Sequence, residues 1–166
     1  MGISKLRHGL GSEHPLCDRI QLLMLILFFV VWGADSLGFF MFGYSTVVFE
    51  ALAFPLLFAG TFVSLCLSFY LVAKSHKAVL EQVSDPPKLV DSDVYAWVRH
   101  PMYLGTLLFC LAFLFISVSL VSIAIWIVFF IFYDRMATYE EKNLIEILGE
   151  QYTAYQKRLS KWLPGV

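Results

Sequence analysis

The chain alternates long apolar blocks with polar segments, and the blocks are long enough to cross a membrane. Residues 20–44 and 47–73 are apolar almost throughout, and roughly 20 apolar residues in a helix span the hydrocarbon core of a bilayer. Residues 102–133 form a third block without one charged side chain. A single helix of that length would extend about 48 Å, well beyond a core of roughly 30 Å. We therefore expect a tight helical hairpin over residues 101–133.

The turn of this hairpin is expected where three serines interrupt the apolar run, at Ser117, Ser119 and Ser122. The helix on either side of the turn is then short for a full span, so the hairpin is expected to be tilted or to lie in a locally thinned bilayer. The pattern as a whole predicts an all-α polytopic membrane protein with about four transmembrane helices.

The basic residues predict an orientation. All 12 Lys and Arg residues fall within residues 1–19, 74–100 and 134–166. With four spans these three segments share one side of the membrane, and an excess of Lys and Arg marks the cytosolic side. Both termini are therefore predicted to be cytosolic, in the inner membrane of a prokaryote or the endoplasmic reticulum of a eukaryote. The whole chain is expected to be one membrane-embedded domain, with its first helix pair at residues 20–73.

Composition excludes the soluble globular class, because 59% of the residues are hydrophobic and only 15% are charged, whereas soluble domains carry about 25% charged residues. The polar N-terminal tail does not resemble a cleavable signal peptide, so the first apolar block is expected to be retained. Cys17, Cys66 and Cys110 lack the spacing of a metal or redox site. Neither a resident metal nor a nucleic-acid partner is expected.

Two acidic residues interrupt the apolar blocks, Asp35 in the first and Glu50 in the second. Acidic residues inside a membrane are candidates for function. The predicted topology, however, places both near the outer ends of their helices, where interfacial water reaches them. The structural interpretation is therefore favoured, and the functional one stays open.

The polar segments contain their own breaks. The second helix is predicted to continue into the cytosol to about Gln82 and to end before Asp85-Pro86-Pro87, because proline interrupts a helix. After the hairpin, residues 134–159 carry apolar side chains at intervals of three and four, which predicts an amphipathic cytosolic helix. Gly149 is expected to break that helix.

Arg99, His100 and Pro101 stand directly before the hairpin. Proline is favoured in the first turn of a helix, so a helix is predicted to begin at Pro101. The first free amides and the positive end of the helix dipole then lie beside Arg99 and His100, where an anionic group such as a carboxylate binds well. The alternative is that both residues only anchor the helix at the cytosolic side.

A second group of charged residues follows the hairpin. Arg135 is followed by the adjacent acids Glu140 and Glu141, and paired carboxylates just past a membrane exit are suited to hold a cation. Glu140 and Leu144 share one helix face, so this carboxylate is expected to point the same way as packed residues. A solvated helix face with i,i+4 ion pairs is the alternative interpretation.

These two groups together resemble a known superfamily of membrane enzymes. The residues that carry the resemblance, in chain order, are Leu89, Val90, Tyr95, Val98, Arg99, His100, Pro101, Met102, Tyr103, Gly105, Arg135, Glu140, Glu141, Leu144, Gly149, Tyr152 and Tyr155. The pattern is similar to that of the isoprenylcysteine carboxyl methyltransferases and phospholipid methyltransferases, and it covers roughly residues 89–164. The chain departs from the family pattern at Asp93, where a glycine is usual, at Leu148, where a phenylalanine is common, and at Ser160-Lys161, which replace a proline-arginine pair.

The resemblance implies a cofactor and a set of contacts. It implies S-adenosylmethionine as methyl donor, enclosed between the hairpin and the C-terminal helix by the residues His100, Pro101, Tyr103, Gly105, Glu140 and Glu141. Aromatic faces can stabilise the sulfonium of the donor, and Gly105 leaves room for a ligand or a neighbouring helix.

The resemblance also implies an acceptor with a lipophilic or prenylated part that enters from the bilayer. A prenylcysteine-type carboxylate is favoured; such an acceptor needs only a cation to position it, for which Arg99 and Arg135 are the candidates. An aminophospholipid would instead need a base, for which His100, Glu140 and Glu141 are the candidates. A sterol-reductase-like enzyme and a non-catalytic membrane scaffold remain as alternatives from other classes.

Overall fold

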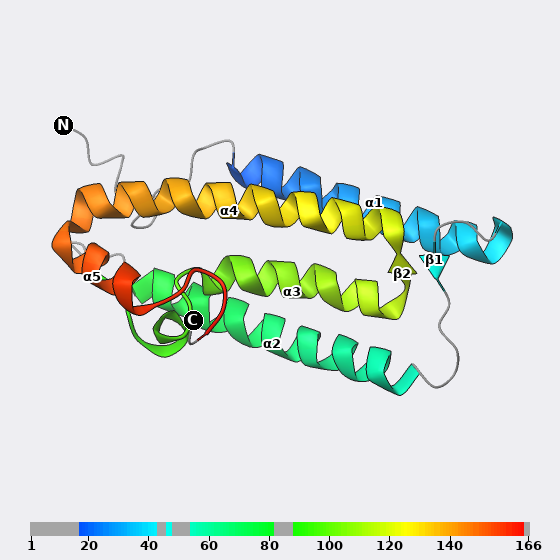
Figure 1. The fold of residues 1–166 in the computed structure, drawn as a ribbon, viewed down its shortest axis with the longest axis horizontal. Coiled ribbons are helices and arrows are strands. Elements are labelled where there is room, and N and C mark those ends of the chain that lie inside the picture. Colours follow the sequence, from blue (N-terminus) through cyan, green and yellow to red (C-terminus); the bar gives the residue numbers. More distant parts are fainter. Residues whose placement is uncertain (1–16, 43–45, 48–53, 82–87, 165–166) are drawn as a thin grey trace.

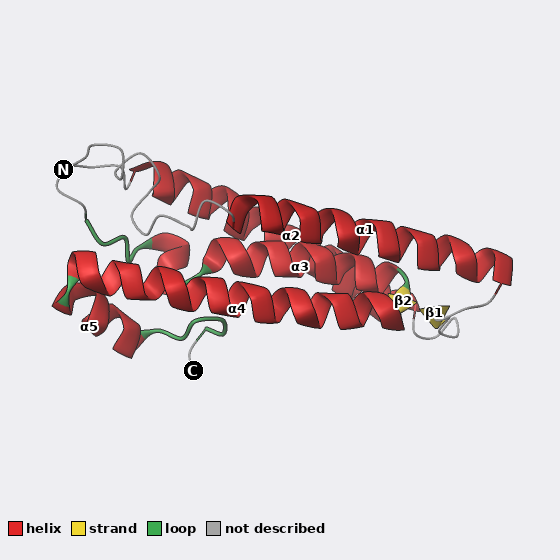
Figure 2. Cartoon of the chain, turned by 90° about the horizontal axis from the view of Figure 1, so that it is seen from above, coloured by secondary structure: helices red, strands yellow, loops and turns green. Residues whose placement is uncertain are grey.

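The computed structural model describes residues 17–42, 46–47, 54–81 and 88–164 as a bundle of helices lying side by side (Figures 1 and 2). The elements are α1 (Cys17–Phe42), β1 (Thr46–Val47), α2 (Phe54–Glu81), the 3-10 helix η2 (Asp93–Ala96), α3 (Pro101–Ile116), β2 (Val118–Ser119), α4 (Leu120–Leu148) and α5 (Glu150–Arg158).

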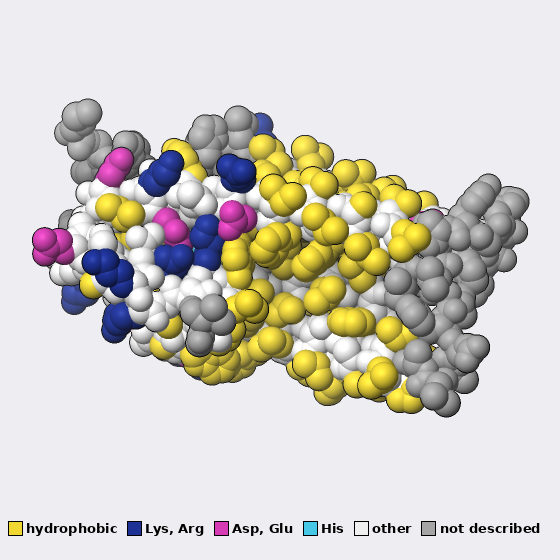
Figure 3. All heavy atoms as spheres, viewed as in Figure 1, with side chains coloured by type: hydrophobic (Ala, Val, Ile, Leu, Met, Phe, Trp, Pro, Cys, Tyr) yellow, Lys and Arg dark blue, Asp and Glu magenta, His cyan; other side chains and the backbone are white. Residues whose placement is uncertain are grey.

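The structure confirms an all-α polytopic membrane protein. Three helical segments are long and apolar enough to cross a membrane, namely Arg19–Gly38, Phe54–Ala78 and Leu120–Leu148, and α3 is a shorter apolar helix. Exposed apolar side chains cover the middle of the bundle in Figure 3, whereas Lys, Arg, Asp and Glu side chains gather at the end where α5 lies. A surface of this kind is stable only in lipid, so the protein is an integral membrane protein.

The start of the second helix differs from the sequence prediction. The second helix begins at Phe54 and not at residue 47, because Val47 belongs to β1, which pairs antiparallel with β2 through Thr46↔Ser119 and Val47↔Val118. Pro55 stands next to the new start, where its missing N–H costs no hydrogen bond. The cytosolic extension of α2 is confirmed as far as Glu81. Glu50 and the Asp85-Pro86-Pro87 break lie outside the described residues.

The hairpin is confirmed, and its second helix is longer than expected. Ser119 caps α4, because its side chain accepts a hydrogen bond from the backbone N–H of Ser122 at 3.1 Å. The amphipathic segment predicted over residues 134–159 begins as a direct continuation of the hairpin, since α4 runs unbroken for 29 residues to Leu148. The break at Gly149 is confirmed, with a φ of 58° that glycine adopts without strain. The Glu140-Glu141 pair therefore stands on the same rigid helix that crosses the membrane.

The short helix α3 lies at the centre of the bundle, and side chains of its neighbours bond to its carbonyls. Trp32 of α1 donates to the carbonyl oxygen of Phe113 at 3.0 Å. Ser68 of α2 donates to Gly105 at 2.7 Å, and Trp126 of α4 donates to Leu107 at 2.9 Å. Hydrogen bonds between helices in an apolar medium are held firmly because no water competes for them. They fix where the N-terminus of α3, and hence His100, lies.

The far end of the bundle holds Asp35. Its neighbour Ser36 shares a hydrogen bond of 2.6 Å with Ser117 in the hairpin turn, so Asp35 lies at the end opposite to His100. This agrees with the predicted position of Asp35 near the outer end of its helix.

Candidate functional site

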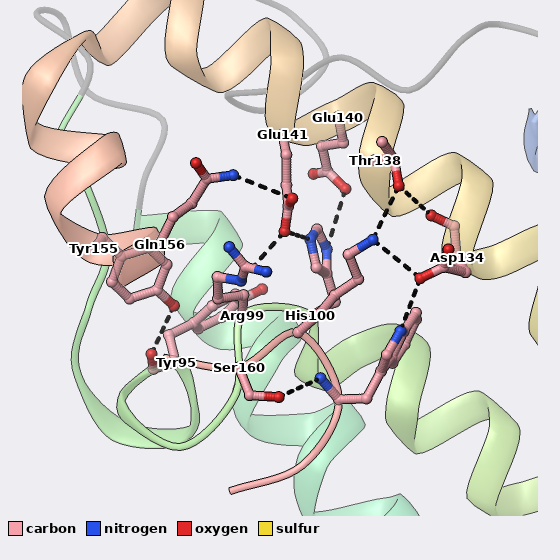
Figure 4. Close-up of polar contacts among 12 residues, drawn as sticks. Tyr95, Arg99, His100, Asp134, Thr138, Glu140, Glu141, Tyr155, Gln156 and Ser160 are labelled. Carbon is pink, nitrogen blue, oxygen red and sulfur yellow. Dashed lines mark hydrogen bonds and ion pairs between the residues drawn. The ribbon is translucent and has the colours of Figure 1, made fainter. Parts of the chain in front are cut away.

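His100 is the centre of a polar cluster at the N-terminus of α3 (Figure 4). Its Nε2 lies 3.0 Å from Oε1 of Glu141, and its Nδ1 lies 3.6 Å from Oε2 of Glu140. The residue is only 6% exposed. The two motifs that the sequence separates by a whole helical hairpin therefore meet at one imidazole ring.

Glu140 is held by an aromatic residue of α3. The hydroxyl of Tyr103 donates to Oε2 of Glu140 at 2.9 Å. The rings of Tyr103 and His100 lie nearly parallel, 5.5 Å apart with 2° between their planes. Pro101 begins the helix between them and is buried. This wall of the cluster thus combines a carboxylate with two stacked flat rings.

Glu141 receives groups from three parts of the chain. Besides His100, Nε of Arg99 lies 3.3 Å from its Oε1, and the side-chain amide of Gln156 donates to its Oε2 at 3.1 Å. The Nε of Arg99 is buried and has no hydrogen-bond partner among the described residues. The arrangement thus holds a half-buried cation in an ion pair with a carboxylate, at a geometry that does not form a hydrogen bond.

The C-terminal residues form a further side of the cluster. The backbone N–H of Arg99 donates to the carbonyl oxygen of Ser160 at 3.1 Å. The ammonium group of Lys161 binds Oδ1 of Asp134 at 3.0 Å and Oγ1 of Thr138 at 2.9 Å. Lys161 stands where the resemblance expects arginine, so the cation at this position is retained and its function is to tie the C-terminus to α4.

Sequence analysis missed three members of this arrangement, namely Asp134, Thr138 and Gln156. Asp134 and Thr138 stand seven and three residues before the predicted Glu141, which places all three on one helix face; that spacing was the available signal. Gln156 could not be found in this way, because its approach to Glu141 depends on the reversal of direction at Gly149.

Two predicted site residues do not join the cluster. Arg135 is exposed, and in the described part of the chain it forms no hydrogen bond or ion pair. Gly105 faces α2: a Cβ built on it would lie 2.8 Å from Cγ2 of Val72 and 3.2 Å from the carbonyl oxygen of Ser68. Its role in the structure is close helix packing, one of the two reasons for a glycine that the sequence suggested.

The loop before α3 contains a strained residue. Asp93 has a φ of 55°, the one non-glycine residue in the left-handed region among those described, and it is the position where the resemblance expects glycine. Aspartate tolerates this region better than most residues. Its carboxylate also pairs with Lys74 at 2.9 Å, so an aspartate here adopts a backbone conformation that favours glycine.

Burial governs the titration of the cluster. It lowers the pKa of His100 below the ordinary value of 6.5, although the hydrogen bond to Glu141 acts in the opposite direction, and the nearby cations Arg99 and Lys161 lower the pKa further. Burial also raises the pKa of Tyr152 and Tyr155. At neutral pH the imidazole is therefore neutral, and it donates one N–H to Glu141. Among the described residues no group of three or more His, Cys, Asp or Glu side chains is placed to hold a metal ion.

The lowered pKa of His100 predicts that acid destabilises the protein. The unfolded chain binds a proton at this residue below about pH 6.5 and the folded protein does not, so the free energy of unfolding falls as the pH drops from 7 towards 5, by at most about 1.4 kcal/mol per pH unit. His100→Gln, which keeps a donor for Glu141, is expected to flatten this dependence. Thermal unfolding in detergent between pH 5 and 7.5 measures it; equal slopes in both proteins would contradict the prediction.

Comparison with known proteins agrees with this geometry. Residues 48–151 match the family model described as phospholipid methyltransferase. The chain belongs to this family. The matched range contains His100, Tyr103, Glu140 and Glu141, whereas Gln156 and Lys161 lie beyond it. Both groups of residues that carry the resemblance therefore lie within the matched range, and the fold brings them into contact.

Individual proteins that are similar to this chain are methyltransferases by name. The chain is 38% identical over 91 residues to human protein-S-isoprenylcysteine O-methyltransferase, covering 53% of this chain and 31% of that protein. It is 32% identical over 81 residues to the enzyme of the same name from Schizosaccharomyces pombe, covering 46% and 33%. Methanethiol S-methyltransferase of Pseudomonas deceptionensis is 36% identical over 86 residues, covering 49% and 32%. The matches thus span about a third of each relative. No solved structure matches the chain.

Proposed function

We propose that this protein is an integral membrane methyltransferase that transfers a methyl group from S-adenosylmethionine to a lipophilic acceptor. The observation that supports this most is the His100 cluster, in which the ion pair of Arg99 with Glu141 lies next to His100, Glu140 and two stacked aromatic rings. Membership of a family named for methyl transfer to phospholipids, and relatives named for methyl transfer to prenylcysteine and to a thiol, support the same activity.

The residues of the cluster fit the chemical groups of S-adenosylmethionine. Its carboxylate needs a cation or free N–H donors, which Arg99 and the first turn of α3 offer. Its ammonium group needs a carboxylate, which Glu140 and Glu141 offer. When bound, the cofactor supplies a methyl group on a positively charged sulfur, and the rings of Tyr103 and His100 are suited to lie near such a charge.

The protein's own residues orient the reactants and exclude water. Three partners hold the side chain of Glu141, so it cannot turn outward into solvent. His100 keeps its position through the hydrogen bond to this carboxylate. In-line methyl transfer needs no enzyme nucleophile, and holding both reactants in register provides much of the acceleration. Burial of the cluster at the edge of the apolar helices keeps the acceptor atom dry.

We favour a prenylcysteine-type carboxylate as acceptor. A carboxylate is already ionised and needs only positioning by a cation. With the N–H groups in the first turn of α3 left to hold the carboxylate of the cofactor, Arg99 is the better candidate for this task, since it is half-buried in the cluster while Arg135 points to solvent. N-methylation of an aminophospholipid is the alternative; it would require a base, and neutral His100 is the group available for it.

The site is proposed to face the cytosol. The described charged residues gather at the end of the bundle that carries the His100 cluster (Figure 3), and the basic segments 74–100 and 134–166 meet there. An excess of basic residues marks the cytosolic side. Both termini then lie in the cytosol, and a lipid-linked acceptor enters the site sideways from the inner leaflet.

Calorimetric titration of the detergent-solubilised protein with S-adenosylmethionine tests the proposal. We expect micromolar binding in the wild type and loss of binding in His100→Ala, because the ring fixes both carboxylates. Radiolabelled methyl transfer to S-farnesyl N-acetylcysteine and to phosphatidylethanolamine then separates the two acceptor classes. Absence of cofactor binding to the folded wild type would refute the proposal, and binding of a nicotinamide nucleotide in its place would favour the reductase-like alternative.

A further inference from the structure

The C-terminal strap, residues 159–164, lies against the N-terminal end of α3 and against α4. It is tied to the loop before α3 by the bond from Arg99 N–H to the carbonyl oxygen of Ser160, and to α4 by the ion pair of Lys161 with Asp134. The side chain of Ser160 accepts from the backbone N–H of Trp162 at 3.4 Å and of Leu163 at 3.2 Å, which turns the strap back on itself. These contacts place the indole of Trp162 between His100 and Phe130.

Trp162 lies at the boundary between the polar cluster and the apolar helices. Its ring centre is 6.2 Å from that of His100 on one side and 5.4 Å from that of Phe130 on the other. Phe130 lies one helical turn before Asp134 on α4, towards the membrane-spanning part. The half-buried indole packs against the hydrophobic core cluster of the bundle. One flat side chain thus borders both the proposed reaction centre and the lipid-facing part of the bundle.

The orientation of the indole is fixed by Asp134. The Nε1–H of Trp162 donates to Oδ1 of Asp134 at 3.0 Å, and the same oxygen accepts from Lys161. A partly buried indole N–H needs such a partner. The carboxylate therefore holds the ring at a defined angle, and the cation beside it compensates its charge at the membrane edge.

We propose that Trp162 determines acceptor specificity, by forming the wall against which the apolar chain of the acceptor lies as it leaves the His100 cluster for the bilayer. This inference rests on the proposed function. The polar partners suited to the cofactor, Arg99, Glu140 and Glu141, surround His100. Trp162 instead lies between the ring of His100 and that of Phe130. A lipid tail that runs from the His100 cluster to the bilayer must take this direction. A large rigid ring supplies much contact area to such a chain at low cost in conformational entropy.

Kinetics with two acceptors that differ only in chain length tests the inference. With S-farnesyl and S-butyl N-acetylcysteine as acceptors, Trp162→Ala is expected to raise the KM for the farnesyl compound about tenfold, leaving the KM for the butyl compound and the affinity for S-adenosylmethionine unchanged. Trp162→Phe is expected to restore most of the preference for the farnesyl chain. Trp97→Ala is the matched control, because Trp97 is exposed and stacks on Tyr70 on the surface of the bundle. Equal KM changes for both acceptors, or a tenfold loss of cofactor affinity, would overturn the inference.

A binding measurement separates this inference from the proposed activity. With the photoreactive p-benzoylphenylalanine at position 162, irradiation is expected to cross-link the protein to radiolabelled S-farnesyl N-acetylcysteine; the same group at position 97 is expected not to. Cross-linking without methyl transfer would support the acceptor wall and contradict the proposed activity. Methyl transfer by the wild type without cross-linking at position 162 would contradict the acceptor wall alone, and absence of both would count against both.

Discussion

Glu141→Gln is expected to weaken binding of S-adenosylmethionine by about a hundredfold or more. Glu141 is only 7% exposed, and its carboxylate is contacted by His100, Arg99 and Gln156. Glutamine keeps the shape but loses the charge, and a hydrogen bond to a charged group contributes about 1.5–3 kcal/mol. A difference of about 1.4 kcal/mol corresponds to a tenfold change in affinity. Loss of two charge-assisted hydrogen bonds between Glu141 and the ammonium group of the cofactor therefore accounts for the expected effect.

The same substitution is expected to reduce stability, since it leaves the guanidinium of Arg99 buried without a full counter-charge. Breaking a buried ion pair by removing one partner costs about 3–5 kcal/mol. The double variant Arg99→Gln/Glu141→Gln should therefore be more stable than the sum of the single variants predicts, and it would still fail to bind the cofactor. That combination separates loss of binding from loss of folding.

Glu146→Gln is the control for this prediction. Glu146 is an exposed residue of the same helix, so its substitution should change neither cofactor affinity nor the unfolding temperature. Calorimetric titration and thermal unfolding of the three variants in one detergent measure all of these effects. Cofactor affinity of Glu141→Gln within threefold of the wild type would show that Glu141 is a structural residue and not a cofactor contact.

Gly105→Ala is the second substitution with a large expected effect, and it acts through packing. The added methyl group would lie 2.8 Å from Cγ2 of Val72 and 3.2 Å from the backbone oxygen of Ser68. Val72 is β-branched and stiff, and a backbone atom cannot move alone, so α2 and α3 must separate. Overpacking of this kind costs about 1–3 kcal/mol, and it also disturbs the bond from Ser68 to the Gly105 carbonyl.

Gly33→Ala is a matched control on α1. A Cβ at Gly33 would meet no atom within 4 Å, and alanine is favoured over glycine inside a helix by about 1 kcal/mol. This variant should therefore unfold at the same temperature as the wild type or slightly above it. If Gly105→Ala behaved like Gly33→Ala in stability but lost cofactor binding, Gly105 would be a cofactor contact, as the family resemblance implies, and not a packing residue.

Several features of the protein follow from local sequence information alone. The apolar blocks, the serine turn and the start of a helix at Pro101 depend on neighbouring residues, and the structure has each of them where the pattern places them. The pairing of the Arg99-His100-Pro101 motif with Glu140-Glu141 was expected only from the resemblance to the methyltransferase superfamily. Positive φ at residue 93 could be inferred only through the glycine usual in the family, because aspartate gives no such signal.

The direction in which each side chain points was decided by tertiary packing. Arg135 and Asp134 are neighbours in sequence, but successive residues of a helix are rotated by about 100°. Packing of α4 against the bundle therefore brings Asp134 to Lys161 and Trp162 and leaves Arg135 in solvent. The approach of Gln156 to Glu141 likewise depends on a chain reversal and on the docking of α5. The sequence by itself determined which chemical groups the protein has and which helices carry them. Only the three-dimensional packing decided which of these groups meet, because contact depends on helix rotation and long-range docking that no local pattern specifies.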